Sequence, residues 1–257
     1  MKTKRGQITI FIIVAIAIII GAGMFFVFRN SESNLNEVNI EVRPVYSFVQ
    51  DCIKQTCEEG VYYVGSSGGY IIAPEKSLNI GFDEGFEKNI AYYPYEEENY
   101  MPTKEKIEDE ISLYVDSMLA FCIADFNSFP EFEVESGEVV SDVRIETGKV
   151  IVDVEYDLSV SKEGQSYEIN EFKGNEIIVR LEKIYDAVSE IMDGQMKKKD
   201  SVCISCLNDI GNKHGMKIRM SESPEGIVFA IVDEKSQLNE RDYEFYFANK
   251  YEVENEI

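Results

Sequence analysis

The feature that most constrains this chain is a run of 21 uncharged residues near its start, from Ile8 to Phe28. Fourteen of these residues are Ile, Val or Phe. As a helix that rises about 1.5 Å per residue, the run is about 31 Å long and matches the ~30 Å hydrocarbon core of a bilayer. A buried helix of a soluble protein rarely lacks a polar face over such a length. We therefore predict one transmembrane helix that places residues 8–28 in the lipid bilayer.

The charges on either side of this run predict its orientation. Lys2, Lys4 and Arg5 precede it, whereas Arg29 is followed by polar and acidic residues. The positive-inside rule places the short N-terminal head in the cytoplasm and the bulk of the chain outside. The alternative is a cleaved secretory signal with a small-residue cut site at residues 21–23. We expect a single-pass protein of the cell membrane whose C-terminal domain is extracellular.

The octapeptide KRGQITIF at residues 4–11, followed by the apolar run, resembles the class III signal of archaeal type IV pilin-like proteins. The resemblance implies that a prepilin peptidase cuts between Gly6 and Gln7 and leaves the apolar helix on the mature protein. Many pilins carry a Glu five residues into the mature chain, where this chain has Phe11. That departure supports pilin-like processing more than filament assembly. The chain as a whole also resembles single-pass surface proteins of small-genome archaea, a resemblance that implies no activity.

The part of the chain beyond the apolar run is strongly acidic. It holds all 48 acidic residues but 22 of the 25 basic ones, a formal net charge of −26. Phosphate groups bind to the opposite sign of charge, so we expect no nucleic acid partner. About 229 residues are enough for one or two domains with their own cores.

The apolar patterns of this outer part predict both helices and strands. Helical spacing is found over about 45–64, from Thr103 as N-cap to about Asp125, over about 176–192 and near 202–210. Period-two alternation predicts strands over about 139–146, 150–158, 166–172, 217–220, 227–233 and 243–251, with a turn at Thr147-Gly148. Helices and strands segregated in this way predict an α+β fold of antiparallel strands packed with three to four helices. The expected organisation is a cytoplasmic head (1–7), a transmembrane helix (8–28), a stalk (29–44) and one domain (45–257), with subdivisions near 130 and 195.

Residues 70–102 combine tyrosines with prolines and acidic residues, and we expect little regular structure there. Two interpretations remain open for the tyrosines. They pin a long loop by packing against it, or they form an exposed recognition surface. The candidate binding-surface residues are Tyr70, Tyr92, Tyr93, Tyr95 and Tyr100.

Five cysteines on an oxidising side of a membrane indicate disulfides. Cys203 and Cys206 can close a small loop at a helix start. Cys52 and Cys57 would point about 140° apart on one helix and should not pair. Cys52 and Cys122 lie on the apolar faces of the first two helices, so their disulfide would join these helices and leave Cys57 buried. Buried reduced thiols are the alternative.

Motifs for catalysis or metal binding are missing from the sequence. Cys203, Cys206 and the single histidine, His214, supply three of the four ligands of a structural zinc site, and no second CxxC follows. His214 falls in what we expect to be an exposed loop, and no GxSxG, HExxH or Walker motif is present. We therefore predict no cofactor and no enzyme, but a structural or adhesive binding protein that contacts itself or other surface proteins. The alternative is a tethered extracytoplasmic hydrolase or redox enzyme that uses carboxylates or the CxxC pair.

Overall fold

The computed structural model describes residues 39–81, 87–96, 98–198 and 201–250. The predicted transmembrane helix and the processing site at Gly6 and Gln7 therefore lie outside the described residues. Of the helices that are described, none is long and apolar enough to cross a membrane. The chain divides into two compact units, residues 1–47 and 48–257, and each is considered by itself below.

In the first unit, the described residues 39–47 form a turn that leads into a helix. The backbone N–H groups of Glu41 and Val42 donate to the side-chain Oδ1 and the backbone oxygen of Asn39, at 3.0 and 3.1 Å. Such a turn at an Asn commonly precedes a helix. Helix α2 (Arg43–Ser66) begins directly after it, so the predicted stalk gives way to a helix at Arg43.

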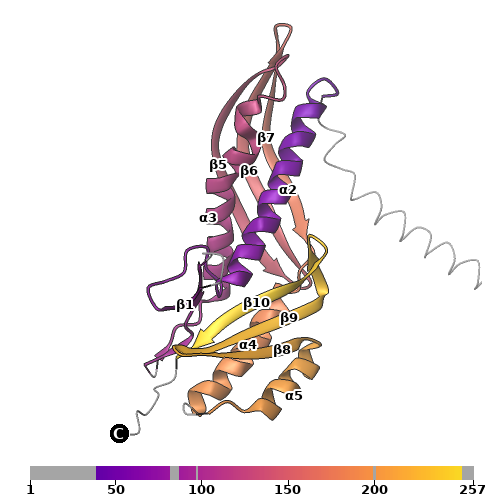
Figure 1. The fold of residues 1–257 in the computed structure, drawn as a ribbon. Helices are drawn as coiled ribbons and strands as arrows, with labels where there is room; N and C mark the ends of the chain where they lie inside the picture. The colour runs from indigo at the N-terminus through magenta and orange to yellow at the C-terminus, as the bar shows by residue number, and fades with distance from the viewer. Residues whose placement is uncertain (1–38, 82–86, 97, 199–200, 251–257) are drawn as a thin grey trace, which may run out of the picture. The chain divides into compact units, whose positions relative to one another are not determined.

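The second unit has the predicted α+β composition, with four helices among the described residues and strands that pair antiparallel in each sheet. Figure 1 shows this arrangement. The helices are α2, α3 (Lys104–Ile123), α4 (Leu181–Lys197) and α5 (Ile204–His214). The longer strands are β5 (Glu133–Glu146), β6 (Lys149–Lys162), β7 (Gln165–Ile177), β8 (Lys217–Ser223), β9 (Gly226–Leu238) and β10 (Arg241–Asn249).

Strands β5, β6 and β7 form a three-stranded meander, as the alternating pattern predicted, but with longer strands. The β5–β6 turn lies at the predicted Thr147-Gly148, and Gly148 adopts a φ of +82° that a glycine accepts at little cost. On β6 the valines at 150, 152 and 154 are buried, and the residues between them are partly exposed. The meander therefore buries one face against the rest of the unit.

Helix α3 covers the edge strand of this meander. Its start is confirmed at Thr103, whose side chain accepts a hydrogen bond from the Lys106 N–H at 3.2 Å. Farther along, Glu108 accepts from the Ile145 N–H at 2.7 Å, and Asp116 from the Ser141 N–H at 2.8 Å. Two backbone donors of β5 are thus satisfied by carboxylates, which protects this edge from pairing with another strand.

A disulfide joins α2 to α3 through Cys52 and Cys122, whose Cα atoms are 5.7 Å apart. This is the pairing that the two apolar faces suggested. Cys57, the remaining cysteine of α2, is buried and free. Burial, with a smaller effect from Glu58, raises the pKa of the Cys57 thiol to about 12, so this thiol stays protonated and unreactive.

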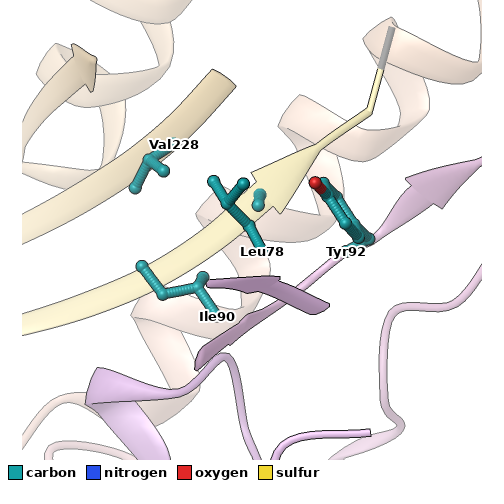
Figure 2. Close-up of a cluster of buried hydrophobic side chains, with 5 residues drawn as sticks. Leu78, Ile90, Tyr92 and Val228 are labelled. Atoms are coloured by element: carbon teal, nitrogen blue, oxygen red, sulfur yellow. The ribbon is translucent and has the colours of Figure 1, made fainter. Parts of the chain in front are cut away.

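Strands β8, β9 and β10 form the second large sheet, which carries much of the aromatic core. Phe229 of β9 stacks on Phe247 of β10, and Phe247 stacks on Tyr93, with 4.9 Å between ring centroids in each pair. A neighbouring apolar cluster, shown in Figure 2, consists of Leu78, Ile90, Tyr92, Val228 and Ala248.

Residues 70–102 contain more regular structure than predicted. Strands β1 (Ser77–Gly81) and β2 (Glu87–Ala91) form one hairpin, and the short β3 (Pro94–Tyr95) and β4 (Glu98–Asn99) form another. Tyr92 bridges to Ala248 of β10, and the Tyr93 N–H donates to the Ala248 oxygen at 2.9 Å. The hairpins are held by this distant strand, so a local sequence pattern did not reveal them.

The predicted start of the third helix was wrong. Ile177 is the last residue of β7, where it pairs with Val150, and α4 begins at Leu181. Arg180, between the two, reaches to β9 and forms a buried ion pair with Asp233, which has no exposed surface. This long-range pair sets the end of the strand and the beginning of the helix.

Candidate functional site

A hollow of about 750 Å³ lies between α2, β2 and the β9–β10 turn with the start of β10. We call it the tyrosine hollow. The lining residues that its chemistry depends on are Tyr62, Tyr63, Lys88, Arg241, Glu244 and Tyr246.

Two neighbouring tyrosines of α2 form one wall of the tyrosine hollow. Tyr62 is 52% exposed and Tyr63 44% exposed, and their rings meet edge to face at 5.6 Å. Behind them, the ring of Tyr114 lies 5.3 Å from that of Tyr63, and the Tyr114 hydroxyl donates to Glu59 Oε2 at 3.1 Å. The Tyr63 ring is therefore held from behind by α3 and in turn contacts the Tyr62 ring, while much of the surface of both rings faces solvent.

The floor of the tyrosine hollow is formed where α2 meets β10. The buried Tyr243 donates its hydroxyl hydrogen bond to the Val61 oxygen at 2.9 Å. Gly65 allows this close approach, because a Cβ at that position would lie 2.5 Å from the Tyr243 hydroxyl oxygen and 2.8 Å from the Glu244 backbone oxygen. The helix that carries Tyr62 and Tyr63 is thus fixed directly to the sheet.

The opposite wall combines a lysine, a tyrosine and an ion pair. Lys88 Nζ lies 3.6 Å from the centroid of the Tyr246 ring, a favourable cation–π contact. The Tyr246 hydroxyl donates to Glu244, which also accepts from Arg219 at 2.5 Å. Burial lowers the pKa of Lys88 to about 8, although Glu244 partly opposes this effect. Burial and the hydrogen bond to Glu244 raise the pKa of Tyr246, so its phenol remains neutral.

The tyrosine hollow mixes hydrogen-bond donors and acceptors without a dominant charge. Lys88 and Arg241 oppose the carboxylates of Glu59, Asp242 and Glu244. All three carboxylates already accept hydrogen bonds: Glu59 from Gln55 and Tyr114, Glu244 from Arg219 and Tyr246, and Asp242 from Gln237 at 3.4 Å. Flat aromatic surface beside such balanced polar groups suits a ligand that is uncharged, polar at its edges and apolar on one face.

The tyrosines that the sequence singled out do not form one exposed surface. Tyr92 and Tyr93 are buried, at 4% and 0% exposure, and belong to the core, which removes them from any recognition face. Tyr70, Tyr95 and Tyr100 are partly buried. Lys76 Nζ lies 3.9 Å from the Tyr100 centroid and 4.9 Å from that of Tyr95, so these rings pack with their own segment. The interpretation in which the tyrosines pin their own segment fits this geometry.

The predicted position of His214 in an exposed loop was wrong. His214 is the last residue of α5, its side chain is only 13% exposed, and its Nε2 lies 3.1 Å from Glu190 Oε2. Cys203 and Cys206, at the other end of α5, are joined in a disulfide with Cα atoms 5.2 Å apart. Within the described ranges, no group of three His, Cys, Asp or Glu side chains is arranged to hold a metal ion.

Sequence reasoning missed the residues that line the tyrosine hollow. Tyr62 and Tyr63 were passed over because they lie off the apolar stripe of the first helix. Consecutive tyrosines on the polar side of an amphipathic helix were nevertheless a usable signal, because such a position exposes large rings on a rigid element. Lys88 and Tyr246 meet only through folding, and nothing in their local sequence connects them.

Comparisons with known proteins assign the chain to no family. No protein-family model matches the chain, and no curated protein or solved structure does so at a significant level. Any functional conclusion therefore has to come from the residues of the chain and their arrangement.

Proposed function

We propose that this chain is a membrane-anchored extracytoplasmic binding protein that contacts a surface partner through the tyrosine hollow. The observation that carries the proposal is the pair of half-exposed rings, Tyr62 and Tyr63, fixed to a helix that is itself clamped to a sheet. Tyrosine rings offer a large contact area and lose little side-chain entropy on binding. A rigid support lowers the cost of binding further.

The anchor and the location are supported by the sequence and by the cysteines. The uncharged run of residues 8–28 is long enough to span a bilayer, and four of the five cysteines are joined in disulfides. Disulfides persist on the oxidising side of a membrane, which agrees with an extracytoplasmic domain. Processing between Gly6 and Gln7 by a prepilin peptidase belongs to the same proposal.

The charge distribution favours a neutral, hydroxyl-rich ligand such as a cell-surface carbohydrate. An outer part with a net charge of −26 repels polyanions. A cationic ligand would be repelled by Lys88 and Arg241 in the lining of the tyrosine hollow. Lys88 also already occupies the cation–π position over the Tyr246 ring. A sugar can place an apolar ring face on Tyr62 or Tyr63 and exchange hydrogen bonds with the polar groups beside them.

Binding is tested with the full chain in detergent micelles and with neutral oligosaccharides of glucose, mannose and N-acetylglucosamine. We expect saturation-transfer NMR to show that protons of the bound sugar lie close to tyrosine rings. We also expect the affinity for the sugar to fall about 2- to 10-fold in Tyr62→Ala or Tyr63→Ala. Phe121→Ala is the matched control, because Phe121 is a 75% exposed aromatic on α3 and does not line the tyrosine hollow. An equal loss in the control, or no binding of any neutral sugar, would contradict the ligand assignment.

The anchor is tested separately, by mass spectrometry of the mature N-terminus from a native membrane fraction. A first residue at Gln7 supports prepilin-type processing, and an intact Met1 or Lys2 supports an ordinary signal anchor. A mature chain that begins at Met24 would refute the membrane anchor.

A further inference from the structure

The disulfide between Cys203 and Cys206 differs from the other disulfide in its exposure. Cys206 is exposed and Cys203 partly exposed, and between them Ile204 is 64% exposed. In contrast, Cys52 is 3% exposed at the contact between two helices. We propose that Cys203–Cys206 is a thiol–disulfide exchange site whose substrate is a dithiol in an extracytoplasmic peptide or protein.

The two sulfurs of this pair have different surroundings. Cys203 is the N-cap of α5, an 11-residue helix, and its Sγ accepts the Cys206 N–H at 3.3 Å. The Ser205 hydroxyl also lies 3.6 Å from this sulfur. Helix N-termini and hydrogen-bond donors stabilise a thiolate, which makes Cys203 the better leaving group. Cys206 presents the sulfur that is open to attack.

The reaction that follows from this asymmetry is a balanced exchange. A thiolate of the substrate attacks Cys206 Sγ, a mixed disulfide forms there, and the bond to Cys203 breaks to release the Cys203 thiolate. The second thiol of the substrate, as a thiolate, then attacks the substrate sulfur of the mixed disulfide and releases Cys206. Two electrons pass from the substrate to the protein, so the substrate ends as a disulfide and Cys203 and Cys206 end as thiols.

The fold does not depend on this bond to keep α5 in place. Leu207 and Ile210 of α5 are buried, and the Met216 N–H donates to the Gly211 oxygen at 2.9 Å at the end of the helix. A cross-link between residues three apart constrains the unfolded chain far less than one between residues 70 apart. The bond between Cys203 and Cys206 can therefore open and close while the helix remains folded.

The first test compares the two disulfides within the full chain. The protein is equilibrated in glutathione buffers of graded ratio, quenched by rapid unfolding in excess iodoacetamide so that buried thiols are also alkylated, and mapped by mass spectrometry. We expect the ratio of reduced to oxidised protein to be at least about tenfold higher for Cys203–Cys206 than for Cys52–Cys122, equivalent to about 30 mV. The free thiol of Cys57 should be alkylated at every glutathione ratio, so it serves as the internal reference. Equal reduction of both pairs, or greater resistance of Cys203–Cys206, would overturn the proposal.

The second test locates the attack and measures exchange. With excess glutathione, the adduct is expected on Cys206 and the free thiol on Cys203. Oxidation of a fluorescent dithiol peptide, with glutathione disulfide as the final oxidant, should be accelerated by the native chain and not by the double variant Cys203→Ser/Cys206→Ser. An adduct on Cys203 would refute the assigned polarity, and equal rates with the double variant would refute the exchange site. Circular dichroism of the double variant checks that it folds.

Discussion

The buried ion pair between Arg180 and Asp233 offers a sharp test of how this fold is held together. Asp233 accepts four hydrogen bonds: from Arg180 Nε at 2.9 Å, from Arg180 Nη2, from the Ser236 hydroxyl at 2.5 Å and from the Lys235 N–H at 3.2 Å. The substitution Asp233→Asn keeps the shape of the side chain and removes its charge. It also places an amide donor where an acceptor is needed.

The expected cost of this substitution follows from the burial of both partners. Removing one member of a buried ion pair typically costs 3–5 kcal/mol, because the remaining charge stays desolvated without a counter-ion. The Arg180 side chain is 15% exposed, and its Nη2 also donates to the Gly215 oxygen at 3.3 Å. Both features reduce the loss of stability, because the guanidinium keeps some solvation and one hydrogen bond. We therefore expect a loss of about 3 kcal/mol in the free energy of unfolding at pH 7.

The cost of Asp233→Asn should become smaller in acid. Burial alone opposes ionisation of Asp233, but the hydrogen bonds from Arg180, Ser236 and Lys235 outweigh it and hold the pKa of Asp233 below its ordinary value. Because the folded pKa is the lower one, this stabilisation is complete above the unfolded pKa of about 3.9 and is lost as the pH falls through the folded pKa. The difference in stability between the native chain and the variant should thus begin to shrink as the pH falls below about 4, and it should keep shrinking until the pH has passed the lower, folded pKa of Asp233.

Urea unfolding, followed by tyrosine fluorescence since the chain has no tryptophan, measures this difference. The midpoint for Asp233→Asn should fall by about 1 M urea at pH 7 with an unchanged m-value. Glu234→Gln is the matched control. In its ion pair with Lys217, the Lys217 side chain is 66% exposed and the Glu234 side chain 55%, so the pair should contribute less than about 1 kcal/mol. Similar losses for both variants at pH 7, or a difference between the native chain and Asp233→Asn that is as large at pH 3 as at pH 7, would refute the reasoning.

Two further predictions concern local structure. Thr103→Ala should destabilise the protein by about 1 kcal/mol, because the Lys106 N–H loses its cap, and Thr103→Ser should restore most of it in a thermal melt. Gly65→Ala should cost about 1–3 kcal/mol, because the added methyl would overlap the Tyr243 hydroxyl. In α4, where nothing lies within 4 Å of an added Cβ, Gly194→Ala should instead stabilise by up to about 1 kcal/mol, and the reverse order in the same assay would contradict the geometry.

Elements with a strong local signal were predictable from the sequence. The meander β5–β7 was predictable from the alternation of apolar and polar residues around Val150 and from the turn at Gly148. Both signals are properties of a few consecutive residues. The cap at Thr103 is equally local. Such signals need no knowledge of which distant segments meet.

The remaining features depend on distant contacts. Ile177 and Leu181 have helical spacing, yet Ile177 belongs to β7, because its partner is a strand and Arg180 is held by Asp233 on β9. The tyrosine hollow exists only where α2, β2 and β10 meet, and Lys88 reaches the Tyr246 ring only in the folded unit. No pattern confined to one segment encodes such a site.

The disulfide between Cys52 and Cys122 also determines how the protein would carry a mechanical load. A pull applied on the N-terminal side of Cys52 and on the C-terminal side of Cys122 passes across the S–S bond, so residues 53–121 form a closed loop that bears no tension. Tyr62, Tyr63 and Lys88 all lie in this loop. In a protein held at its N-terminus under flow, these three residues of the tyrosine hollow would therefore stay unstretched for as long as the disulfide remains intact.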